Sequence, residues 1–442
     1  MSTSQAVRAH RPMGRLVLAS LLGNALEWYD FFLYGTAAAL VFGPLFFPGA
    51  DPLAGTLASL STFTIGFLAR PLGGLVFAHF GDRRGRKQTL VATLTLMGVA
   101  TFLIGVLPTY ATIGVWAPAL LVVVRLVQGI AAGGEWGGGV LLISENAPAE
   151  RRGMFSAWSQ TGVIAGFALS AIAFTGARTL AGTEAAFVSW GWRLPFLLGI
   201  VLTLVGLYIR SRIDEAPEFV TARAEQATHR IPLWELLRTQ RREVLIAMGA
   251  RLAENTASYL FLVFALSYGK QLGIDETVTL SGVVAASVLA GGAMVGFGAL
   301  SDHVGRRPVY MGGAIGLAVW AYPFFLLMQS REPAAVWLAL IVGLGLCHAA
   351  MVGVQPAFFS ELFTGPVRYS GMALGHELAS ILAGGVSPLI ATLLIGWTGN
   401  VWPVALYLAA VSALTVWALA ASRETRPHSS SETSRREIEL MR

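Results

Sequence analysis

The stretch Gly81-Asp82-Arg83-Arg84-Gly85-Arg86-Lys87 recurs 220 positions later as Ser301-Asp302-His303-Val304-Gly305-Arg306-Arg307. Each copy follows a long apolar block. The matching positions are Asp82 and Asp302, Gly85 and Gly305, Arg86 and Arg306, and the final basic residues Lys87 and Arg307. Chance rarely places such a charged motif twice in so apolar a chain. The recurrence predicts that the molecule is built from two similar halves that run in the same direction.

A second landmark supports the duplication at nearly the same offset of 216 residues. It consists of one acidic and one basic residue that flank a short polar interval: Glu145 with Arg152 in the first half, and Glu361 with Arg368 in the second. The longest polar interruption, 211–242, falls between the two copies. We expect six apolar blocks on either side of it.

The composition is that of a membrane protein. Of the 442 residues, 55% are hydrophobic and 13% are charged, against about 25% charged residues in soluble domains. The apolar residues come in blocks of about 18 or more, which is long enough to span a bilayer. Cys347 is the only cysteine, so the chain has no disulfide framework and no cysteine-based metal site. The net charge of +6 reflects short basic loops rather than a nucleic-acid surface.

The pattern predicts an all-α protein with twelve transmembrane helices. The expected spans are 16–42, 56–80, 88–107, 114–143, 153–177, 192–210, 243–268, 278–300, 308–328, 334–360, 368–396 and 401–421. Of the 31 Lys and Arg residues, 24 fall in the tails and alternate loops on one side and four on the other. This asymmetry places both termini in the cytoplasm. The first block carries Glu27 and Asp30 and is too long for a signal peptide.

These boundaries divide the chain into five parts. We expect a cytoplasmic N-terminal tail (1–15), a six-helix half (16–210), a cytoplasmic linker (211–242), a second six-helix half (243–421) and a disordered cytoplasmic tail (422–442). Within the linker, 231–238 has the pattern of a short amphipathic helix at the membrane surface.

Charged residues inside the spans are the candidates for function, because burying them in a membrane is costly. Asn24, Glu27, Asp30 and Tyr34 share one helical face of the first span. The spans hold five acids and three arginines in total: Glu27, Asp30, Glu135, Glu254, Glu377, Arg70, Arg125 and Arg251. Fully ionised they would leave a net charge of −2. We therefore expect one or two protons to bind among them.

Counting residues along each helix at about 1.5 Å per residue gives the depth of each charge. Asp30 and Arg125 come to similar depths, and so do Glu27 and Arg70. When depth is measured from the cytoplasmic ends of the spans, Arg251 and Glu377 lie at similar depths. Glu254 lies one helical turn from Arg251. The predicted groups are two pairs in the first half and one cluster in the second. On span four, Gly129, Gly133 and Gly137 predict a close-packing edge rather than a phosphate loop.

The chain resembles the major facilitator superfamily, and within it the metabolite–proton symporters. The resemblance extends over about 14–421 and rests on the stretches 27–31, 69–74, 81–87, 125–129, 133–138, 191–196 and 368–371. Members of that family carry α-ketoglutarate, citrate, shikimate, or proline and betaine. The Trp of 133–138 and the stretch 368–371 resemble the shikimate-like, organic-acid branch most. The resemblance implies a fold of two six-helix halves and transport by alternating access.

The resemblance also implies residue roles. In related sugar–proton symporters, an aspartate on the first helix alternates between binding a proton and pairing with an arginine on the fourth. Asp30 and Arg125 match those positions, with Glu27 and Glu135 in support. The loop motifs are implied to form an inner gate: Asp82, Arg83, Gly85, Arg86, Lys87, Glu145, Arg152, Asp302, Gly305, Arg306, Arg307, Glu361 and Arg368. A simple anchoring role for these basic loops is the alternative.

The remaining polar and aromatic residues within the spans are candidates to line a substrate site. They are Arg70, Tyr34, Gln128, Trp136, Gln160, Arg251, Glu254, Asn255, Tyr259, His348, Gln355, His376 and Glu377. We expect Arg70 or Arg251 to hold a substrate carboxylate. His348 or His376 could titrate near neutral pH. A buried neutral histidine that makes one hydrogen bond is the commoner case, so both roles stay open.

The sequence thus favours a proton-coupled symporter that imports a small organic acid, acting as a monomer in the bacterial inner membrane. It needs no cofactor, metal or nucleic acid. The alternative is a proline/betaine carrier, in which Trp28 and Trp136 could cage a quaternary ammonium. A membrane enzyme is disfavoured because no catalytic motif is found. A transport-like sensor is disfavoured because no large signalling domain is present.

Overall fold

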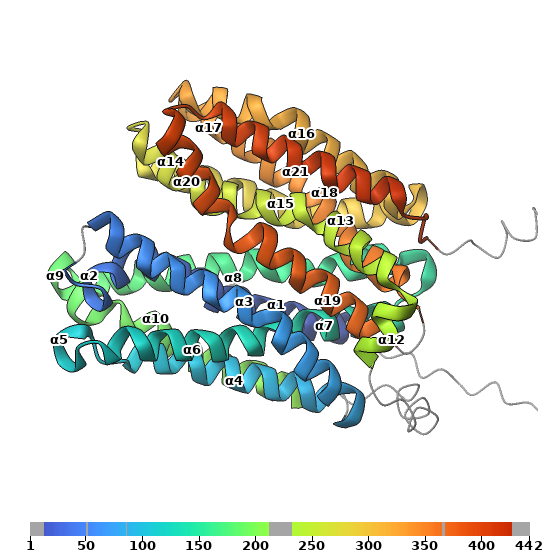
Figure 1. The fold of residues 1–442 in the computed structure, drawn as a ribbon, viewed down its shortest axis with the longest axis horizontal. Coiled ribbons are helices and arrows are strands. Elements are labelled where there is room, and N and C mark those ends of the chain that lie inside the picture. Colours follow the sequence, from blue (N-terminus) through green and yellow to red (C-terminus); the bar gives the residue numbers. More distant parts are fainter. Residues whose placement is uncertain (1–12, 50–51, 85, 212–231, 365–366, 427–442) are drawn as a thin grey trace, which may run out of the picture.

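The computed structural model describes residues 13–49, 52–84, 86–211, 232–364 and 367–426. This part of the chain is helical throughout, with turns and short irregular links and no strand. Figure 1 shows that α1 to α10 gather in one bundle and that α13 to α21 gather in a second bundle beside it. The all-α prediction is therefore confirmed.

Each expected span of the first half falls on a helix or a run of helices. The elements of the first bundle are α1 (Met13–Ala37), η1 (Ala38–Phe42), α2 (Gly43–Phe46), α3 (Pro52–Arg84), α4 (Arg86–Val106), α5 (Tyr110–Ile113), α6 (Trp116–Gly133), α7 (Glu135–Asn146), η2 (Ala149–Arg151), α8 (Arg152–Ala181), α9 (Glu184–Ala186), η3 (Phe187–Gly191) and α10 (Arg193–Ser211). The elements η1 and η3 are π-helical and η2 is a 3₁₀ turn.

The second half repeats this arrangement. Its elements are α13 (Arg241–Tyr259), η4 (Leu260–Phe264), α14 (Ala265–Gln271), α15 (Glu276–Val304), α16 (Arg306–Gln329), α17 (Pro333–Leu340), η5 (Ile341–His348), α18 (Ala349–Leu362), α19 (Arg368–Ala379), η7 (Ser380–Gly385), α20 (Ser387–Thr398) and α21 (Trp402–Ala421). The segments η4, η5 and η7 are π-helical interruptions of long helices. Such π-bulges occur often at functional sites, and all three lie in the helices that carry the polar residues of this half.

The helices have the length and apolarity of membrane spans. Among the described residues, nine helices are long and apolar enough to cross a membrane, and the bent pair Glu184–Gly191 with Arg193–Tyr208 would be a tenth. The other two expected spans fall on α3, whose apolar part Ser61–Phe77 is shorter, and on α13. Helix α13 has a low mean hydropathy because it carries several charged residues.

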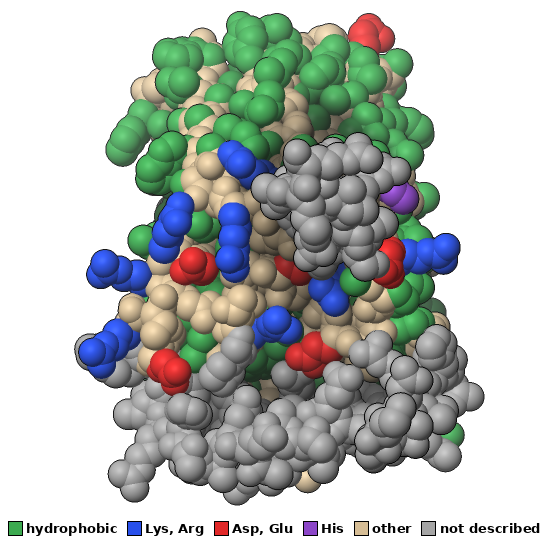
Figure 2. Space-filling view, turned by 90° about the vertical axis from the view of Figure 1, so that its right-hand side faces the viewer, with side chains coloured by type: hydrophobic (Ala, Val, Ile, Leu, Met, Phe, Trp, Pro, Cys, Tyr) green, Lys and Arg blue, Asp and Glu red, His purple; other side chains and the backbone are tan. Residues whose placement is uncertain are grey.

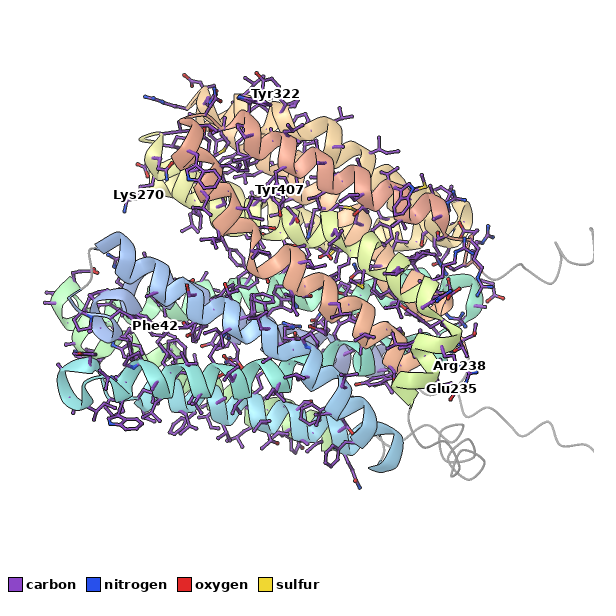
Figure 3. The ribbon with its side chains drawn as sticks, viewed as in Figure 1. Phe42, Glu235, Arg238, Lys270, Tyr322 and Tyr407 are labelled. Atoms are coloured by element: carbon purple, nitrogen blue, oxygen red, sulfur yellow. The ribbon has the colours of Figure 1, made fainter. Side chains whose placement is uncertain are left out.

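One end of the molecule is rich in positive charge. We call it the basic end, defined by Arg151, Arg152, Arg238, Arg241, Arg242 and Arg307. Figure 2 looks onto this end and shows Lys and Arg side chains gathered there among carboxylates. In Figure 3, Glu235 and Arg238 lie at the basic end, whereas Lys270 lies at the opposite end. The placement of the basic end in the cytoplasm remains a prediction.

The amphipathic helix predicted in the linker is present as α12 (Pro232–Thr239). It lies at the basic end (Figure 3), where Leu236 is fully buried while Leu237 and Arg238 are exposed. The rest of the linker and the expected disordered tail beyond 426 lie outside the described residues.

Glycines let α6 approach α3 closely. A Cβ on Gly133 would overlap the carbonyl oxygen of Arg70, and a Cβ on Gly129 would overlap that of Gly66. The predicted packing edge is therefore present at these two positions. Gly137 differs, because it faces the ring of Tyr369 at ordinary contact distance. The backbones of α3 and α6 are therefore in direct contact at these positions.

Candidate functional site

Arg70 lies at the junction of the two halves. It projects from the middle of α3 and is only 4% exposed. Its Nη2 lies 2.6 Å from Oε1 of Glu27 on α1, and its Nε lies 2.6 Å from Oε2 of Glu377 on α19. One guanidinium thus pairs with one carboxylate from each half, and we call this trio the cross-half bridge.

The partners of the cross-half bridge are themselves held in place. His376 Nδ1 lies 2.8 Å from Oε1 of Glu377. The His376 ring stacks on Trp136 of α7, with centroids 3.8 Å apart and an interplanar angle of 18°. Because Trp136 belongs to the first half, this stack is a second link between the halves.

The depths counted along the helices predicted some ion-pair partners correctly and others wrongly. The expected pair of Glu27 and Arg70 is formed. The expected grouping of Glu377 with Arg251 is wrong, because Glu377 turns toward Arg70 of the other half. Depth along a helix says nothing about which neighbour a side chain faces, and that is set by helix packing.

Arg125 does not form the expected ion pair with Asp30. No contact of 4.0 Å or less joins the two among the described residues. Instead Arg125 Nη1 donates to Gln128 Oε1 at 2.5 Å, and Gln128 Nε2 donates to Thr101 Oγ1 at 2.7 Å. The Thr101 hydroxyl in turn donates to the carbonyl oxygen of Met97 at 3.0 Å. Arg125 is therefore held by an amide and not by the Asp30 carboxylate.

Aromatic rings surround the Arg125 guanidinium. Its Cζ lies 4.2 Å from the ring centroid of Tyr34, 5.1 Å from that of Phe63 and 5.2 Å from that of Phe31. Its Nε is buried and has no hydrogen-bond partner among the described residues. Ring faces attract cations, so they partly replace the carboxylate that Arg125 lacks.

A second charged cluster occupies the middle of the second half. Arg251 Nη1 lies 3.2 Å from Oε2 of Glu254 and donates to Gln355 Oε1 at 2.8 Å. Gln355 Nε2 also donates to the hydroxyl of Tyr310 at 2.9 Å. Arg251 and Glu254 are thus a buried pair that a polar amide completes, as such pairs require.

Three further candidates line this region. His348 Nε2 lies 2.7 Å from the hydroxyl of Ser258 and 3.7 Å from Oε1 of Glu254. Tyr259 packs against Phe31 and Phe67 of the first half, with centroids 6.0 and 5.7 Å apart. Asn255 is buried, and in the part of the chain that the structure describes its Nδ2 has no hydrogen-bond partner. Of these three, Tyr259 reaches the junction of the two halves.

A small pocket opens beside Glu27, between α1, α7 and α8. Its enclosed volume is about 10 Å³, which is room for about one water molecule. Its polar lining comprises Ser20, Asn24, Glu27, Glu135, Ser159 and Gln160, with Trp136 as its aromatic wall. Glu135 also accepts a hydrogen bond from Thr93 at 2.9 Å. The predicted residues Glu27, Glu135, Trp136 and Gln160 are therefore brought together.

The second loop motif forms a latch at the basic end. The Asp302 carboxylate accepts from the backbone N–H groups of Gly153 and Met154, at 2.8 and 2.9 Å. These N–H groups begin α8 of the other half, where the helix dipole favours an anion. Asp302 thereby joins the two halves at this end.

Arg306 organises the rest of the latch. It is fully buried and pairs with Asp302 at 2.6 Å and with Glu361 at 3.1 Å. Glu361 also pairs across the halves with Arg152, at 3.4 Å. Gly305 has a φ of 114°, a conformation that suits only glycine, and this turn directs Arg306 back toward Asp302.

The other gate candidates have different surroundings. Arg307 Nη2 donates to the carbonyl oxygen of Ala420 at 2.9 Å, and Arg368 Nε donates to that of Phe363 at 3.1 Å. Arg368 is thus not an ion-pair partner of Glu361 within the described residues. Glu145 is exposed near the end of α7. The remaining candidates lie outside the described residues or their described side chains: Asp82, Arg83, Gly85, Arg86 and Lys87.

The structure adds residues that the sequence interpretation missed. Thr101 and Tyr310 complete the hydrogen bonding of the buried glutamines, and Thr93 binds Glu135. Glu424, beyond α21, accepts from the backbone N–H groups of Arg306 and Arg307 at 2.8 and 3.1 Å. Lone hydroxyl residues in apolar spans carry no sequence signal, so only their contacts identify them. In the described part of the chain, no group of three or more His, Cys, Asp or Glu residues could hold a metal ion.

Comparison with known proteins identifies the family. The model of the Major Facilitator Superfamily matches residues 20–375 and 256–440. The shikimate transporter of Escherichia coli (strain K12) is 42% identical over 415 residues, which cover 91% of this chain and 93% of the relative. The proline/betaine transporter of the same strain is 35% identical over 408 residues, covering 90% and 81%.

Two further comparisons agree. The inner membrane metabolite transport protein YhjE of Escherichia coli (strain K12) is 40% identical over 422 residues, covering 94% of this chain and 95% of the relative. Among solved structures, the proton:xylose symporter XylE bound to 6-bromo-6-deoxy-D-glucose superposes with a TM-score of 0.76 at 17% identity, covering 92% of this chain and 94% of XylE. The chain therefore belongs to the Major Facilitator Superfamily, as a multi-pass membrane transporter of the group that includes these shikimate, metabolite and proline/betaine proteins, and it is not an enzyme.

Proposed function

We propose that this transporter is a proton-coupled symporter that imports a small organic acid of the shikimate type by alternating access. The observation that carries the proposal is the cross-half bridge, in which buried Arg70 pairs with Glu27 and Glu377 at 2.6 Å each. The similarity to a shikimate transporter at 42% identity supports the substrate class.

Through the cross-half bridge, a substrate carboxylate can control the movement of the two halves relative to each other. Arg70 offers a planar fork of donors, which suits bidentate binding of a carboxylate. A substrate carboxylate that binds Arg70 competes with Glu377, which belongs to the other half. Loss of that contact loosens one of the links between the halves. Binding of the acid is thereby coupled to their relative movement.

The surplus of buried acids supports proton coupling. Asp30 is 6% exposed, and among the described residues no cationic side chain lies within 4.0 Å of it. A carboxylate without a cation in a low dielectric is stabilised by taking up a proton. In this mechanism Asp30 carries the proton, Arg125 responds to its charge, and Glu27 and Glu135 assist.

The latch at the basic end is the proposed inner gate. Asp302 and Glu361 of the second half hold Gly153, Met154 and Arg152 of the first half. Such contacts must break for the basic end to open. A charge at a helix terminus is worth about 0.3–1 kcal/mol, which is weak enough for a latch that has to reopen. With the basic end in the cytoplasm, this latch closes the inner side.

A zwitterionic osmolyte such as proline or betaine is the second candidate. Phe31, Phe63, Phe67 and Tyr259 form one aromatic cluster at the junction of the halves, with centroids 4.6 to 6.3 Å apart. Aromatic faces bind quaternary ammonium groups. The similarity to a proline/betaine transporter at 35% identity supports this candidate too.

Uptake measurements in cells that lack their own carriers separate the two candidates. Labelled shikimate and labelled betaine are supplied in parallel, each with an excess of the other compound unlabelled. We expect saturable shikimate uptake that a protonophore abolishes and that betaine does not inhibit. Saturable betaine uptake without competition from organic acids would refute the organic-acid assignment. A vector control and the Arg70→Ala variant define the background.

A further inference from the structure

Two arginines from different helices meet at the end of α21. Arg242 Nη2, near the start of α13, donates to the carbonyl oxygen of Ala421 at 2.8 Å. Arg307 Nη2, near the start of α16, donates to the carbonyl oxygen of Ala420 at 2.9 Å. Helix α21 packs along both α13 and α16 (Figure 1). The two guanidiniums are therefore bound to consecutive carbonyl groups at one helix end.

This helix end lies at the boundary of the membrane spans. Helix α21 is a candidate span over Trp402–Ala421, and α16 is one over Arg306–Gln329. Both arginines thus stand where an apolar segment begins or ends, at the basic end of the molecule. Long basic side chains near the ends of membrane helices reach toward the interface. The two guanidiniums are therefore placed at the depth of the lipid headgroups.

Capping of α21 accounts for one of these arginines better than for two. A cation near a helix C-terminus is favoured by about 0.3–1 kcal/mol, but a second guanidinium beside it is repelled by the first. Each guanidinium has several N–H donors and makes one hydrogen bond within the described part of the chain. Arg307 Nε is buried and lacks an acceptor among the described residues. The pair therefore has room for a further anionic acceptor.

Acidic side chains do not offset the charge of this pair. In the described ranges, no carboxylate oxygen lies within 4.0 Å of either guanidinium. Glu424 accepts from backbone N–H groups at the start of α16 instead, and exposed Arg423 precedes it. Glu243 follows Arg242 in the chain and forms no ion pair with it in the described structure. The local charge is therefore positive.

The surface next to the two arginines is apolar. Trp417 is 72% exposed and lies one helical turn before Ala420 and Ala421, so it shares their face of α21. On α13, Leu245 is 65% exposed and lies one helical turn from Arg242. Tryptophan is enriched at the membrane–water interface. The two guanidiniums thus stand at the end of an apolar surface that faces the lipid.

We infer that Arg242 and Arg307 form a binding site for the headgroup of an anionic phospholipid. Basic pockets between membrane helices bind such headgroups. The phosphate accepts charge-assisted hydrogen bonds from the two guanidiniums, and the acyl chains lie along Trp417 and Leu245. A free phosphate gains nothing from this apolar surface, so the lipid is the favoured source of the anion. The inference does not depend on the transported substrate.

The lipid site adjoins the latch. Arg307 directly follows Arg306, which pairs with Asp302 and Glu361. A headgroup that binds both Arg242 and Arg307 connects the first turns of α13 and α16 with the last turn of α21. Bound lipid should therefore stabilise the second half against unfolding, because a ligand that binds only the folded state raises its stability.

The test follows thermal unfolding of the purified full-length protein in a mild neutral detergent. Phosphatidylglycerol, phosphatidylcholine with the same acyl chains, or inorganic phosphate is added in increasing amounts at constant ionic strength. Wild type is compared with the double variant Arg242→Gln/Arg307→Gln. The matched control is Arg238→Gln/Arg241→Gln, which removes the same charge from exposed positions at the same basic end. A glutamine amide can still donate to the carbonyl groups of α21, so loss of charge is the main change at the site.

We expect phosphatidylglycerol to raise the unfolding temperature saturably in wild type and in the matched control. Phosphatidylcholine and inorganic phosphate should have little effect at the same concentrations. Arg242→Gln/Arg307→Gln should weaken the apparent affinity for phosphatidylglycerol by about tenfold or more, the usual loss of a hydrogen bond between charged groups. Arg242→Lys/Arg307→Lys should retain most of the binding, because lysine binds a phosphate as a point charge.

Three results would overturn the inference. Equal stabilisation by phosphatidylcholine and phosphatidylglycerol would show that the charge of the headgroup is not recognised. Equal stabilisation by inorganic phosphate would assign the two arginines to a free anion. An unchanged response of Arg242→Gln/Arg307→Gln would place the lipid elsewhere. If this double variant shows no unfolding transition, the single variants Arg242→Gln and Arg307→Gln decide the test by the same criteria.

Discussion

Replacing Glu377 by Gln removes one carboxylate from the cross-half bridge and should shift the balance between the conformations. In the structure Glu377 accepts from Arg70 at 2.6 and 3.4 Å, and its side chain is 1% exposed. The Gln side chain has nearly the same size but no charge. Glu27 stays on Arg70, so the arginine is not left unpaired. The substitution therefore acts mainly on the link between the halves.

The size of the effect follows from the burial of the pair. Truncating one partner of a buried, hydrogen-bonded charge pair costs about 2–5 kcal/mol. We take the lower end, about 2 kcal/mol, because Glu27 still neutralises Arg70. At 1.4 kcal/mol per factor of ten, this corresponds to a shift of about 30-fold away from the present conformation. The other conformations, which do not contain the Arg70–Glu377 contact, do not bear this cost.

Distances between spin labels on the two halves measure this shift. Cys347 is the only cysteine, so a Cys347→Ser background carries Glu184→Cys on α9 and Lys270→Cys on α14. Both positions are exposed and belong to different halves. In the background protein we expect one dominant distance. With Glu377→Gln added, we expect that population to fall and a second distance to grow.

The matched control is Glu332→Gln, which neutralises an exposed carboxylate near the start of α17. It should leave the distance distribution unchanged. If Glu377→Gln also leaves both the distribution and the affinity for shikimate unchanged, the cross-half bridge does not set the conformation. The reasoning from its 2.6 Å contact would then be wrong.

Three further substitutions test other parts of the molecule. Asp30→Asn should abolish accumulation driven by a proton gradient while leaving counterflow measurable; accumulation by this variant would exclude Asp30 as the proton carrier. Arg70→Lys should lower the affinity for substrate in uptake assays, because a lysine cannot make a bidentate carboxylate contact, and unchanged uptake would contradict the role of Arg70. Gly133→Ala should lower the thermal stability through a clash costing about 1–3 kcal/mol, since its Cβ would overlap the Arg70 carbonyl oxygen. Gly176→Ala, with open space around its Cβ, is the control, and equal stability of the two variants would refute the packing argument.

The sequence by itself determined which segments form helices and how these helices divide into two halves. Apolar length gives the spans, and the two copies of the loop motif give the two halves. It also placed Glu27 and Arg70 at one depth, where the structure pairs them. Hydropathy and the rise per residue are properties of each helix alone, so they can be taken from the sequence without knowledge of its neighbours.

Only the tertiary structure decided which charges meet. Glu377 pairs with Arg70 across the halves, and Arg125 donates to Gln128 rather than to the Asp30 carboxylate. Depth is one coordinate, whereas a contact also depends on how each helix is rotated and on which helix lies beside it. Those two quantities follow from packing, for example from the glycines that let α6 approach α3. For the same reason the sequence did not show that Asn24 and Glu27 each keep a buried oxygen without a hydrogen-bond partner among the described residues.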